Sequence, residues 1–591
     1  KTFYAADRLY VDHKQAIVGG TTFFSKFDFD RRTGAATFVE DLNGNKQYSQ
    51  ADSFGRLRLH TRVPVGGAVQ VIGSVAYYDV VGPVVDTTSY SAQGKSALSR
   101  THFDGDGRSL GTVELADGVA LRTEFKQHDA FGRVVSAALP SYASSVDDYE
   151  VVADSRRVTT QTDGFDRLTK ITNSDGTFST SEYAPRVTYV TNPRGYTTER
   201  QVDWRGNVVQ VKRYGDNNVV LSSHTVGYDG AGRVVQVNDA DGTVRRVEYD
   251  AGGRKRKVEL PHANAPNVAI QHYEYCHDVE DAIASSLSPE GRSVSVIRDT
   301  AGRALFSQAT LGNTTVQSML SYDDPAATNG IGRLTKTVDD SGTSLLQYDA
   351  FGRLRQIDRA LPQGLVSGPE AYTSVFDYDY AGDLNSFTVK SPTKTLASVS
   401  YTRDSRGRAT KVTSSNATVV DGIVFDENHH VTSAHFGNDV SGSWGFDPVT
   451  SRLNSIEYRQ GMAPPFATVL YPNYDENGNL ETESRYDGNG LISQKIHTYS
   501  PLDRLASSDL SHLGNGNSQE AFSYSPAGNL AAAGVDTYTY ARADYPQAVT
   551  HLVGADGVRD LAYSNDGLVT SDIQALEQRS LTWNAAGCLT G

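Results

Sequence analysis

The sequence predicts an all-β fold in which β-hairpins repeat along the chain, and three observations support this prediction. One phrase recurs throughout the 591 residues: an aromatic residue, an acid, two variable residues, Gly-Arg and an aliphatic residue. Neighbouring copies are often 20 or 21 residues apart, and such periods are typical of repeat architectures. Glycine and tyrosine are abundant, with 54 and 32 residues, while no long segment keeps the helical period. We therefore expect very little helix.

The repeated phrase marks a turn between two strands. Glycine supplies the positive φ of a tight turn, Asp accepts hydrogen bonds from the turn backbone, and the flanking Tyr and Leu or Val bury apolar area. We interpret the set as structural, because a catalytic or ligand-binding residue is rarely needed in a dozen copies. The turn residues of the clearest copies are Tyr228, Asp229, Gly232, Arg233, Tyr249, Asp250, Gly253, Arg254, Tyr348, Asp349, Gly352, Arg353, Tyr378, Asp379, Gly382, Tyr474, Asp475, Gly478, Tyr524 and Gly528.

Looser copies extend the pattern over nearly the whole chain. Arg298 and Arg403 replace the aromatic residue, and Asp503 takes the place of the glycine. Trp583 begins the last copy. We expect these copies to form the same kind of turn.

A second turn signal within each unit gives the unit its shape. Gly232 and Gly242 are 10 residues apart, as are Gly332 and Gly342, and Asp166 lies 10 residues before Gly176. Short β-prone runs between alternating turns predict a ladder of hairpins. The best candidate for a short helix is the segment 281–288, which lies in an insertion.

A strip of hairpins twists with a fixed hand, so it is expected to coil rather than stay flat. Its strands alternate Thr, Ser, Gln and Arg with Val and Leu, which predicts that both faces are partly wet. A filled parallel β-helix is the competing architecture. It fits less well because it lacks long hairpins.

Composition argues against several classes of function. The net charge of −15 and the pI near 5.4 argue against a protein that binds nucleic acid or an anionic membrane. No apolar run approaches the roughly 18 to 20 residues of a membrane span. Cys276 and Cys588 lie far apart in different repeats, so we expect neither a disulfide framework nor a zinc site. The chain starts at Lys1, which we interpret as a processed, truncated or partly observed product.

The search for catalytic and metal motifs is mostly negative. The chain has no Gly-x-Ser-x-Gly elbow, Walker loop, His-Glu-x-x-His or Cys-x-x-Cys motif. His429 and His430, and His272 with His277, are the nearest approach to metal pairs. Adjacent histidines on a strand point to opposite faces, so we interpret His429 and His430 as a solvated pair. We therefore expect no catalytic residue, no cofactor and no metal, and we predict that the chain is not an enzyme.

Taken together, the Tyr-Asp-x-x-Gly-Arg-Leu units resemble the YD repeats of the Rhs family of bacterial polymorphic toxins and of the B and C components of insecticidal toxin complexes. The resemblance covers roughly residues 40–591. The phrases at 27–34, 41–45 and 54–57 are similar to the place where long members of that family begin their repeats. We therefore expect residues 1–45 to lead into the repeats and residues 46–591 to form a repeat shell that is incomplete at its C-terminal end.

The resemblance implies a continuous β-sheet wound into a hollow shell, or cocoon, that encloses a C-terminal toxin domain. It also implies two partners: the encapsulated toxin domain, and a delivery apparatus such as a secretion spike or a toxin-complex pore component. The protein would be secreted, or cytoplasmic before delivery. The family's closing segment carries Asp-Pro motifs and a self-cleaving aspartate protease, whereas the last copy here is an ordinary repeat at 583–591. Asp447-Pro448 is interpreted as a turn, so no catalytic aspartate is assigned.

Two other classes of function remain open at this point. One is a YD-repeat protein of the cell surface or wall that adheres to partners or glycans through its exposed face. The other is an enzyme built on the repeat scaffold, such as one that cleaves polysaccharides. A cleft lined by acids and tyrosines outside the repeat pattern would favour the enzyme.

Overall fold

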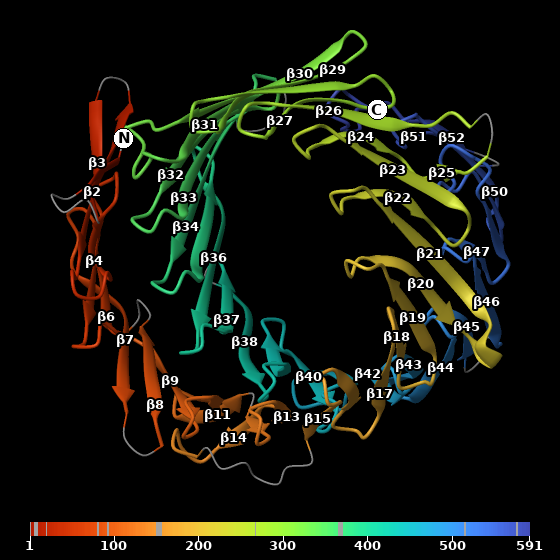
Figure 1. Cartoon of the computed structure of the whole chain (residues 1–591), viewed down its shortest axis with the longest axis horizontal. Helices are drawn as coiled ribbons and strands as arrows, with labels where there is room; N and C mark the ends of the chain where they lie inside the picture. The colour runs from red at the N-terminus through yellow and green to blue at the C-terminus, as the bar shows by residue number, and fades with distance from the viewer. Residues whose placement is uncertain are drawn as a thin grey trace. The chain divides into compact units, whose positions relative to one another are not determined.

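Short antiparallel strands joined by turns make up the chain (Figure 1). The computed structural model describes residues 2–4, 10–18, 21–79, 82–90, 94–123, 125–148, 156–265, 268–364, 370–415, 417–512, 516–574 and 577–591. Parts of the segment expected to lead into the repeats, 1–45, therefore lie outside the described residues. Within them, the single helical element is a short 3-10 turn, η1 (Asp216–Asn218). The predicted all-β fold class is confirmed.

The strands form two sheets that follow chain order. The first sheet has 12 strands, β1 to β11 and then β14. Its strands are β1 (Thr2–Tyr4), β2 (Val11–Val18), β3 (Thr21–Phe29), β4 (Ala36–Glu40), β5 (Lys46–Ala51), β6 (Leu57–Val63), β7 (Gln70–Tyr78), β8 (Val84–Tyr90), β9 (Ser96–Phe103), β10 (Ser109–Ala116), β11 (Val119–Thr123) and β14 (Ser141–Ala143).

The second sheet has 40 strands, which run in chain order through β12, β13 and β15 to β52. Its first strands are β12 (Lys126–His128), β13 (Val134–Ala138), β15 (Arg157–Thr162), β16 (Leu168–Thr172), β17 (Phe178–Ala184), β18 (Val187–Thr191), β19 (Thr197–Val202), β20 (Val208–Tyr214), β21 (Val220–Tyr228), β22 (Val234–Asn238), β23 (Thr243–Tyr249), β24 (Lys255–Glu259), β25 (His262–Ala263), β26 (His272–His277), β27 (Ile283–Leu287), β28 (Ser293–Arg298), β29 (Ala304–Leu311) and β30 (Thr314–Tyr322).

The same sheet continues with β31 (Leu334–Asp339), β32 (Gly342–Tyr348), β33 (Leu354–Ala360), β34 (Ala371–Tyr378), β35 (Leu384–Lys390), β36 (Thr395–Arg403), β37 (Ala409–Ser414), β38 (Ala417–Phe425), β39 (Val431–Phe436), β40 (Val440–Phe446), β41 (Leu453–Gln460), β42 (Ala467–Tyr474), β43 (Leu480–Asp487), β44 (Gly490–Tyr499), β45 (Leu505–His512), β46 (Ser518–Tyr524), β47 (Leu530–Ala533), β48 (Asp536–Thr539), β49 (His551–Gly554), β50 (Gly557–Tyr563), β51 (Val569–Gln574) and β52 (Glu577–Ser580).

The predicted short helix at 281–288 is wrong. Residues Ile283–Leu287 are strand β27, which pairs with β26 and β28. The segment follows directly on a repeat-like turn, in which the Asp278 N–H donates to the Ala282 carbonyl. Because the neighbouring strands supply a ready hydrogen-bonding edge, pairing overrides the weak helical preference of Ala-Ile-Ala-Ser-Ser.

A bulge follows the repeat turns after Tyr228, Tyr249, Tyr348, Tyr378 and Tyr524 and sets the register of each hairpin. Tyr228 pairs with Val234 while Gly227 pairs with Gln236, so residue 235 has no partner across the turn. The same shift occurs after Tyr348, where Arg355 is the extra residue. An extra residue on one strand increases the local right-handed twist. Each repeat turn with this bulge therefore adds to the twist of the sheet.

Few side chains are fully buried. Among the described residues, 11 hydrophobic and 18 polar or charged residues are buried, so a fully buried residue is more often polar than apolar. A small apolar cluster gathers Val113, Ala120 and Phe125, with Leu115 and Ala138 packed against it. Most other strand residues are half-buried. This distribution agrees with the prediction that both faces are partly wet, and it means that polar contacts must hold much of the fold.

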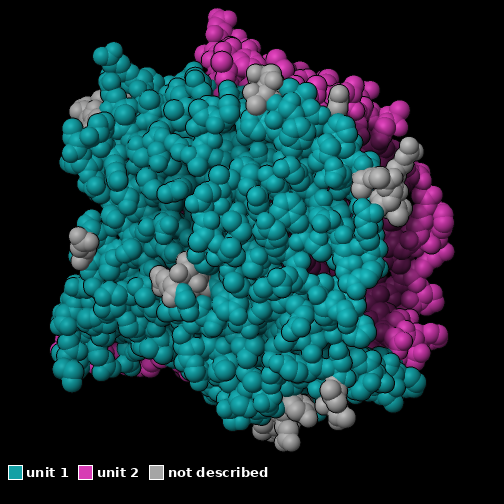
Figure 2. All heavy atoms as spheres, turned by 90° about the vertical axis from the view of Figure 1, so that its left-hand side faces the viewer, with its two compact units in different colours: residues 1–159, 320–453, 457–464 teal, residues 160–319, 454–456, 465–591 magenta. Residues whose placement is uncertain are grey.

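The chain divides into two compact units. Unit 1 comprises residues 1–159, 320–453 and 457–464, and unit 2 comprises residues 160–319, 454–456 and 465–591 (Figure 2). Each unit thus combines an early segment with a later one. Within each unit, neighbouring strands of one segment lie side by side, as β32, β33 and β34 do in unit 1 (Figure 1).

Candidate functional site

The repeat turn is organised around its aspartate. In the copy at 228–234, Oδ1 of Asp229 accepts hydrogen bonds from the backbone N–H groups of Ala231 and Arg233, both at 2.9 Å. Oδ2 accepts from Nε of Arg233 at 2.7 Å. The Asp229 N–H donates to the Arg233 carbonyl, and the Gly232 N–H donates to the Asp229 carbonyl. One carboxylate therefore satisfies the turn backbone and holds the arginine.

This pattern recurs with nearly the same distances. Asp250 and Arg254, and Asp349 and Arg353, reproduce the Asp229–Arg233 contacts. The hydrogen bonds act on the pKa of the carboxyl groups. The backbone N–H of Arg233 holds the pKa of Asp229 below its usual value of 3.8, and that of Arg254 does the same for Asp250. These carboxylates are therefore ionised over the whole neutral and mildly acidic range.

The other predicted turn residues also lie in turns. The Gly382 N–H donates to Oδ1 of Asp379 at 2.8 Å, and the Gly478 N–H donates to the Asp475 carbonyl. Gly528 has φ of 107°. Tyr378, Tyr474 and Tyr524 each end a strand immediately before such a turn. The structure thus spaces these residues along the ladder of hairpins rather than gathering them into one cluster.

The residue before the arginine must adopt a positive φ, which is 81° for Gly232. Asp503 and Asp166 take this place with φ of 58° and 62°, as their spacing predicted. His429 does so as well, with φ of 65°. Asp, Asn and His are the side chains that tolerate this conformation best.

The expectation that His429 and His430 lie on a strand is therefore wrong, although His429 is exposed and His430 half-buried, as expected of a solvated pair. They occupy the glycine and arginine places of a further repeat turn, which follows Phe425. Nδ1 of His430 lies 3.0 Å from Oδ2 of Asp426, and its ring stacks on Phe446. The histidine at the arginine place keeps the link to the turn carboxylate.

The repeat tyrosine ties its turn to the preceding one. The Tyr228 hydroxyl donates to the Val208 carbonyl at 2.8 Å, and the Tyr249 hydroxyl donates to the Val234 carbonyl at 3.0 Å. In both cases the acceptor is the first residue of an earlier strand. Tyr183, Tyr348, Tyr499 and Tyr540 make the equivalent bond, and the Tyr563 hydroxyl donates to the Val549 carbonyl, two residues before β49. The tyrosine hydroxyl is thus a structural hydrogen-bond donor. The sequence pattern had predicted only that the aromatic ring buries apolar area.

The same bond explains which residues replace the tyrosine. Nη2 of Arg403 donates to the Leu384 carbonyl at 2.9 Å, and Nη2 of Arg298 donates to the Ile283 carbonyl at 3.3 Å. Nε1 of Trp583 donates to the Val569 carbonyl at 2.8 Å. Each of these side chains combines a flat body with a donor at its far end. The position selects for that combination rather than for an aromatic ring alone.

The repeat arginine continues the link forward. The guanidinium of Arg233 lies over the ring of Tyr249, 4.6 Å from its centroid, and that of Arg353 lies 4.8 Å from the centroid of Tyr378. Nη1 of Arg353 also donates to the Asp379 carbonyl in the next turn. Cation–π contacts of this kind contribute about 0.5–1 kcal/mol when exposed. Asp, Arg and Tyr therefore form one chain of contacts from turn to turn.

A second class of contacts joins turns far apart in sequence, and we call these contacts the seam of a unit. In unit 1, the side-chain amide of Asn43 donates to the Ile331 carbonyl and accepts from the Ile331 N–H, at 3.1 and 3.0 Å. Asn45, which is buried, donates to Oδ1 of Asn329 at 2.9 Å. The amide of Asn43 thereby imitates a strand pairing across 288 residues.

Arg406 makes the most extensive contact of the unit 1 seam. Its Nε lies 3.3 Å from Oε1 of Glu114, and its Nη2 donates to the Val119 carbonyl at 2.9 Å. The preceding Ser405 donates its N–H and its hydroxyl to the carboxylate of Asp117, both at 2.7 Å. The Arg406 side chain is only 7% exposed, so this ion pair is shielded from solvent.

Arg194 plays the corresponding part in unit 2. Its guanidinium lies 3.2 Å from Oδ2 of Asp475 and 2.9 Å from Oδ1 of Asp503. It also donates to the carbonyls of Tyr499 and Ser500, both at 3.0 Å. One arginine thus binds two repeat turns of the later segment.

Asp566 provides a further contact in the unit 2 seam. Its carboxylate accepts from the hydroxyl of Ser288 at 2.9 Å and from the N–H of Glu290 at 3.0 Å. Nη2 of Arg292 lies 3.1 Å from Oδ2 of Asp566. The Asp566 side chain is 2% exposed, so a repeat turn inserts a buried carboxylate into the opposing turn.

The seam follows a rule that the sequence did not reveal. In both units, repeat turns of the later segment contact hairpin turns of the early segment, and several of the contacting side chains occupy the variable places of a turn. Asn43, Arg194 and Arg406 all stand directly before a turn glycine. A polar residue directly before the turn glycine is the sequence signal for a seam contact. Arg205 also occupies this place, but it donates to the nearby Gly230 carbonyl and makes no seam contact within the described residues.

Metal-binding groups and disulfides are both absent from the described residues. In the part of the chain that the structure describes, no three His, Cys, Asp or Glu side chains are grouped to hold a metal ion. Cys276 and Cys588 are exposed free thiols. Among the described residues, no helix is long and apolar enough to span a membrane.

Comparison with known proteins identifies the repeat and the fold. The sequence model of the family described as RHS Repeat matches residues 228–259. The whole chain superposes on TcdB2-TccC3-TEV with a TM-score of 0.80 and 13% identity, covering 38% of that chain. TcdB2-TccC3 without its hypervariable C-terminal region gives a TM-score of 0.79, 13% identity and coverage of 100% of this chain and 37% of that one.

A Tc holotoxin pore of Photorhabdus luminescens, with a point mutation in TccC3, gives a TM-score of 0.79 at 13% identity over 97% of this chain and 37% of that one. No curated protein matches at the level of sequence. The chain therefore spans less than two-fifths of the length of the toxin-complex chains that it matches. The resemblance to Rhs repeats is confirmed by the family match over residues 228–259 and by the fold of the whole chain.

Proposed function

We propose that this chain, whose repeats and fold are those of the Rhs/YD-repeat family, forms part of the wall of a hollow shell that encloses a toxin polypeptide. The observation that carries the proposal is the fold match over the full length of the chain to toxin-complex proteins. In this role the chain is a container rather than an enzyme.

The chemistry of the sheet supports such a role. A wall must be one sheet thick, with water or cargo on both sides, so it cannot depend on a thick apolar core. Buried polar residues outnumber buried hydrophobic ones among the described residues, and ion pairs and hydrogen bonds join turn to turn. A polar wall also exposes few hydrophobic patches on which an unfolded cargo would aggregate.

The proposed partners are an enclosed toxin domain and an apparatus that receives it, such as a toxin-complex pore component. The mature assembly would act outside the producing cell, after release or delivery. We infer no role for nucleic acid, because the chain carries a net charge of −15.

The shape of the purified chain tests the container directly. Small-angle scattering and negative-stain images should show a hollow particle, or an open part of one, with density around an empty or filled centre. A compact solid particle with a groove would overturn the container and favour an enzyme. An extended rod would instead favour an adhesive surface protein.

Enclosure of cargo is tested on the full natural polypeptide. Limited trypsin digestion should leave the enclosed segment intact while cleaving exposed loops. In the Arg194→Ala variant, which weakens the seam of unit 2, the enclosed segment should be cleaved faster. Equal cleavage of cargo and loops in the unaltered protein would contradict enclosure.

A further inference from the structure

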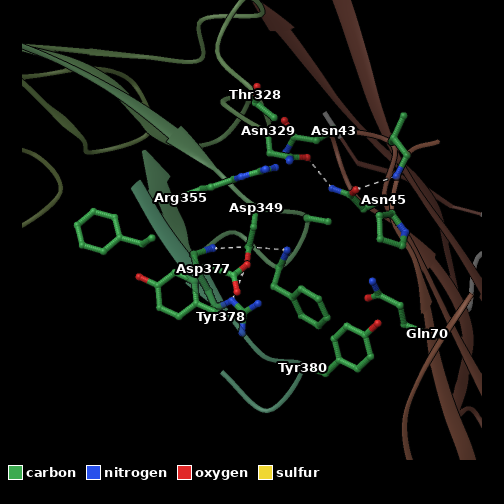
Figure 3. A pocket seen from close by; sticks show the side chains of 16 residues that line it. Asn43, Asn45, Gln70, Thr328, Asn329, Asp349, Arg355, Asp377, Tyr378 and Tyr380 are labelled. Carbon is green, nitrogen blue, oxygen red and sulfur yellow. Dashed lines mark hydrogen bonds and ion pairs between the residues drawn. The ribbon is translucent and has the colours of Figure 1, made fainter. Parts of the chain in front are cut away.

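Unit 1 contains a cavity of about 570 Å³ between its early and later segments. Figure 3 shows Arg355, Asp377, Tyr378 and Tyr380 on the side of the later strands, with Gln70 and Asn45 on the side of the early strands. Sites for small molecules in proteins usually have volumes of about 300–1,000 Å³. The cavity is therefore large enough for a ligand of one to three sugar rings.

Part of the lining belongs to the seam and is fully engaged. The side chains of Asn43 and Asn45 bond to Ile331 and Asn329, and Asn329 donates to the Tyr348 carbonyl at 3.1 Å. These bonds fix the position of the upper wall in Figure 3. A site built on such a wall is already formed before a ligand binds.

Other groups in the lining have no protein partner. Among the described residues, the guanidinium of Arg355 and the carboxylate of Asp377, both on exposed residues at the open side of the cavity, make no hydrogen bond or ion pair. Oε1 of Gln70 is buried and also lacks a hydrogen-bond donor. A buried acceptor without a partner costs about 1–3 kcal/mol, so a ligand that donates to it would recover that energy.

Arg355 is free because of its place in the repeat. It is the extra residue of the bulge that follows the turn at 349–353, so its side chain is released from the regular alternation of β33. Bulges often direct a side chain toward a functional site. Its neighbour in the motif, Arg353, is instead held by Asp349 at 2.7 Å.

Tyr378 departs from the role of the repeat tyrosine. Tyr228, Tyr249 and Tyr348 all donate to the first carbonyl of an earlier strand, whereas the Tyr378 hydroxyl makes no hydrogen bond within the described residues. It lines the cavity instead. Tyr380 lies nearby, with its ring stacked on Phe351 at 6.5 Å between centroids. The cavity thus gathers aromatic surface and free hydroxyl groups.

We propose that this cavity binds a neutral saccharide. A sugar presents hydroxyl groups that both donate and accept, and its C–H faces pack on aromatic rings. Asp377 and Gln70 Oε1 would accept from its hydroxyls, and Arg355 and Tyr378 would donate to its oxygens. The free charges of Arg355 and Asp377 balance, which favours a neutral ligand over an anionic one. An apolar ligand would leave the buried Oε1 of Gln70 without a donor.

The test uses the intact chain on a glycan microarray that carries maltose, cellobiose, chitobiose, N-acetyllactosamine and sialyllactose. We expect binding to at least one neutral glycan, with its affinity then measured by calorimetry. Tyr378→Phe and Arg355→Ala should each weaken that binding by about tenfold, as loss of one hydrogen bond predicts. Both variants should keep the melting temperature of the unaltered chain, because neither group has a protein partner.

Tyr228→Phe is the matched control. It removes a repeat hydroxyl that is engaged in the ladder and lies outside the cavity, so it should lower the melting temperature and leave glycan binding unchanged. Absence of binding to every neutral glycan, binding to sialyllactose alone, or binding that survives both cavity variants would each overturn the proposal. None of these results bears on whether the chain forms a shell.

Discussion

At the residue scale, each recurring position of the repeat has one structural role. The aspartate accepts the turn N–H groups, the glycine place requires a positive φ, and the tyrosine donates to an earlier strand. These tasks explain the substitutions in the looser copies, because Arg403 and Trp583 donate as tyrosine does. The residue at a repeat position can therefore differ between copies, provided that it makes the same hydrogen bond or adopts the same φ.

The hydroxyl of a repeat tyrosine should contribute measurably to stability. In Tyr228→Phe the carbonyl of Val208 loses its donor, so the free energy of unfolding should fall by about 1 kcal/mol. Denaturant unfolding measures the change. Tyr378→Phe is the control, because its hydroxyl has no partner among the described residues, and an equal loss in both variants would contradict the ladder.

The turn aspartates should make stability depend on acid. The pKa of Asp229 and of Asp250 is lower in the folded chain than the usual 3.8, so the folded state releases these protons more readily than the unfolded state does. Their contribution is fully present above pH 3.8 and is lost as pH falls through the lowered folded pKa. Unfolding midpoints measured between pH 6 and pH 2 should therefore drop below about pH 4.

The double variant Asp229→Asn, Asp250→Asn separates this effect from general acid sensitivity. An asparagine cannot lose a proton, so the variant should be less stable at pH 6 and should change less between pH 6 and pH 2. A parallel acid dependence in both proteins would show that other groups govern it.

At the element scale, the hairpin turn and its bulge set both the register and the twist of each unit. The positive φ is an absolute demand of this turn, whereas the space around the glycine varies between copies. Nothing lies within 4 Å of a Cβ added at Gly232, but a Cβ at Gly352 would lie 2.5 Å from Nη2 of Arg333. The two positions therefore differ only in what surrounds them.

Alanine substitutions at these glycines should separate backbone strain from crowding. Gly232→Ala should lower the free energy of unfolding by about 1–2 kcal/mol, because an L-residue is strained at φ of 81°. Gly352→Ala should cost more, since Arg333 must also move from its place over the Tyr348 ring. Gly230→Ala, in the same turn as Gly232 but without a positive φ, should be nearly neutral when measured by thermal unfolding.

At the scale of the whole molecule, each unit depends on its seam. Strand pairing alone joins residues that are near in sequence, whereas Arg194 joins turns more than 300 residues apart. Its partner Asp475 is buried, and besides this cation its carboxylate accepts from the N–H groups of Asn477 and Asn479 and from the side-chain amide of Asn479. Loss of the arginine leaves a buried charge only partly compensated.

Arg194→Ala should therefore destabilise unit 2 by about 2–5 kcal/mol, the usual cost of removing one partner from a buried hydrogen-bonded charge pair. Hydrogen exchange should increase in the turns at 475–479 and 499–504. Arg205→Ala is the matched control, because Arg205 also precedes a turn glycine but its guanidinium contacts Trp204 of its own turn and the Gly230 carbonyl of the adjacent turn. Equal hydrogen exchange in the two variants would show that the seam contact at Arg194 does not stabilise these turns.

The sequence by itself determined the class of fold, the order of the hairpins and the position of most turns, because these depend on local tasks. A glycine or Asp at the positive-φ place acts within five residues of chain, so Asp503 and Asp166 could be placed correctly from spacing alone. The same reasoning failed at His429 and His430, where no glycine or arginine marked the turn. It also failed at Ile283–Leu287, where pairing with neighbouring strands overrode local preference.

Only the tertiary structure decided which variable residues carry the seam and which line the cavity. Arg194 and Arg205 occupy the same place in the motif, yet one reaches a distant turn and the other an adjacent one. Likewise Tyr378 looks like the other repeat tyrosines in the sequence, but it lines the cavity and its hydroxyl makes no hydrogen bond within the described residues. Such differences arise from the small twist added at each hairpin. They accumulate over some 300 residues, so no local pattern can specify which turns finally meet.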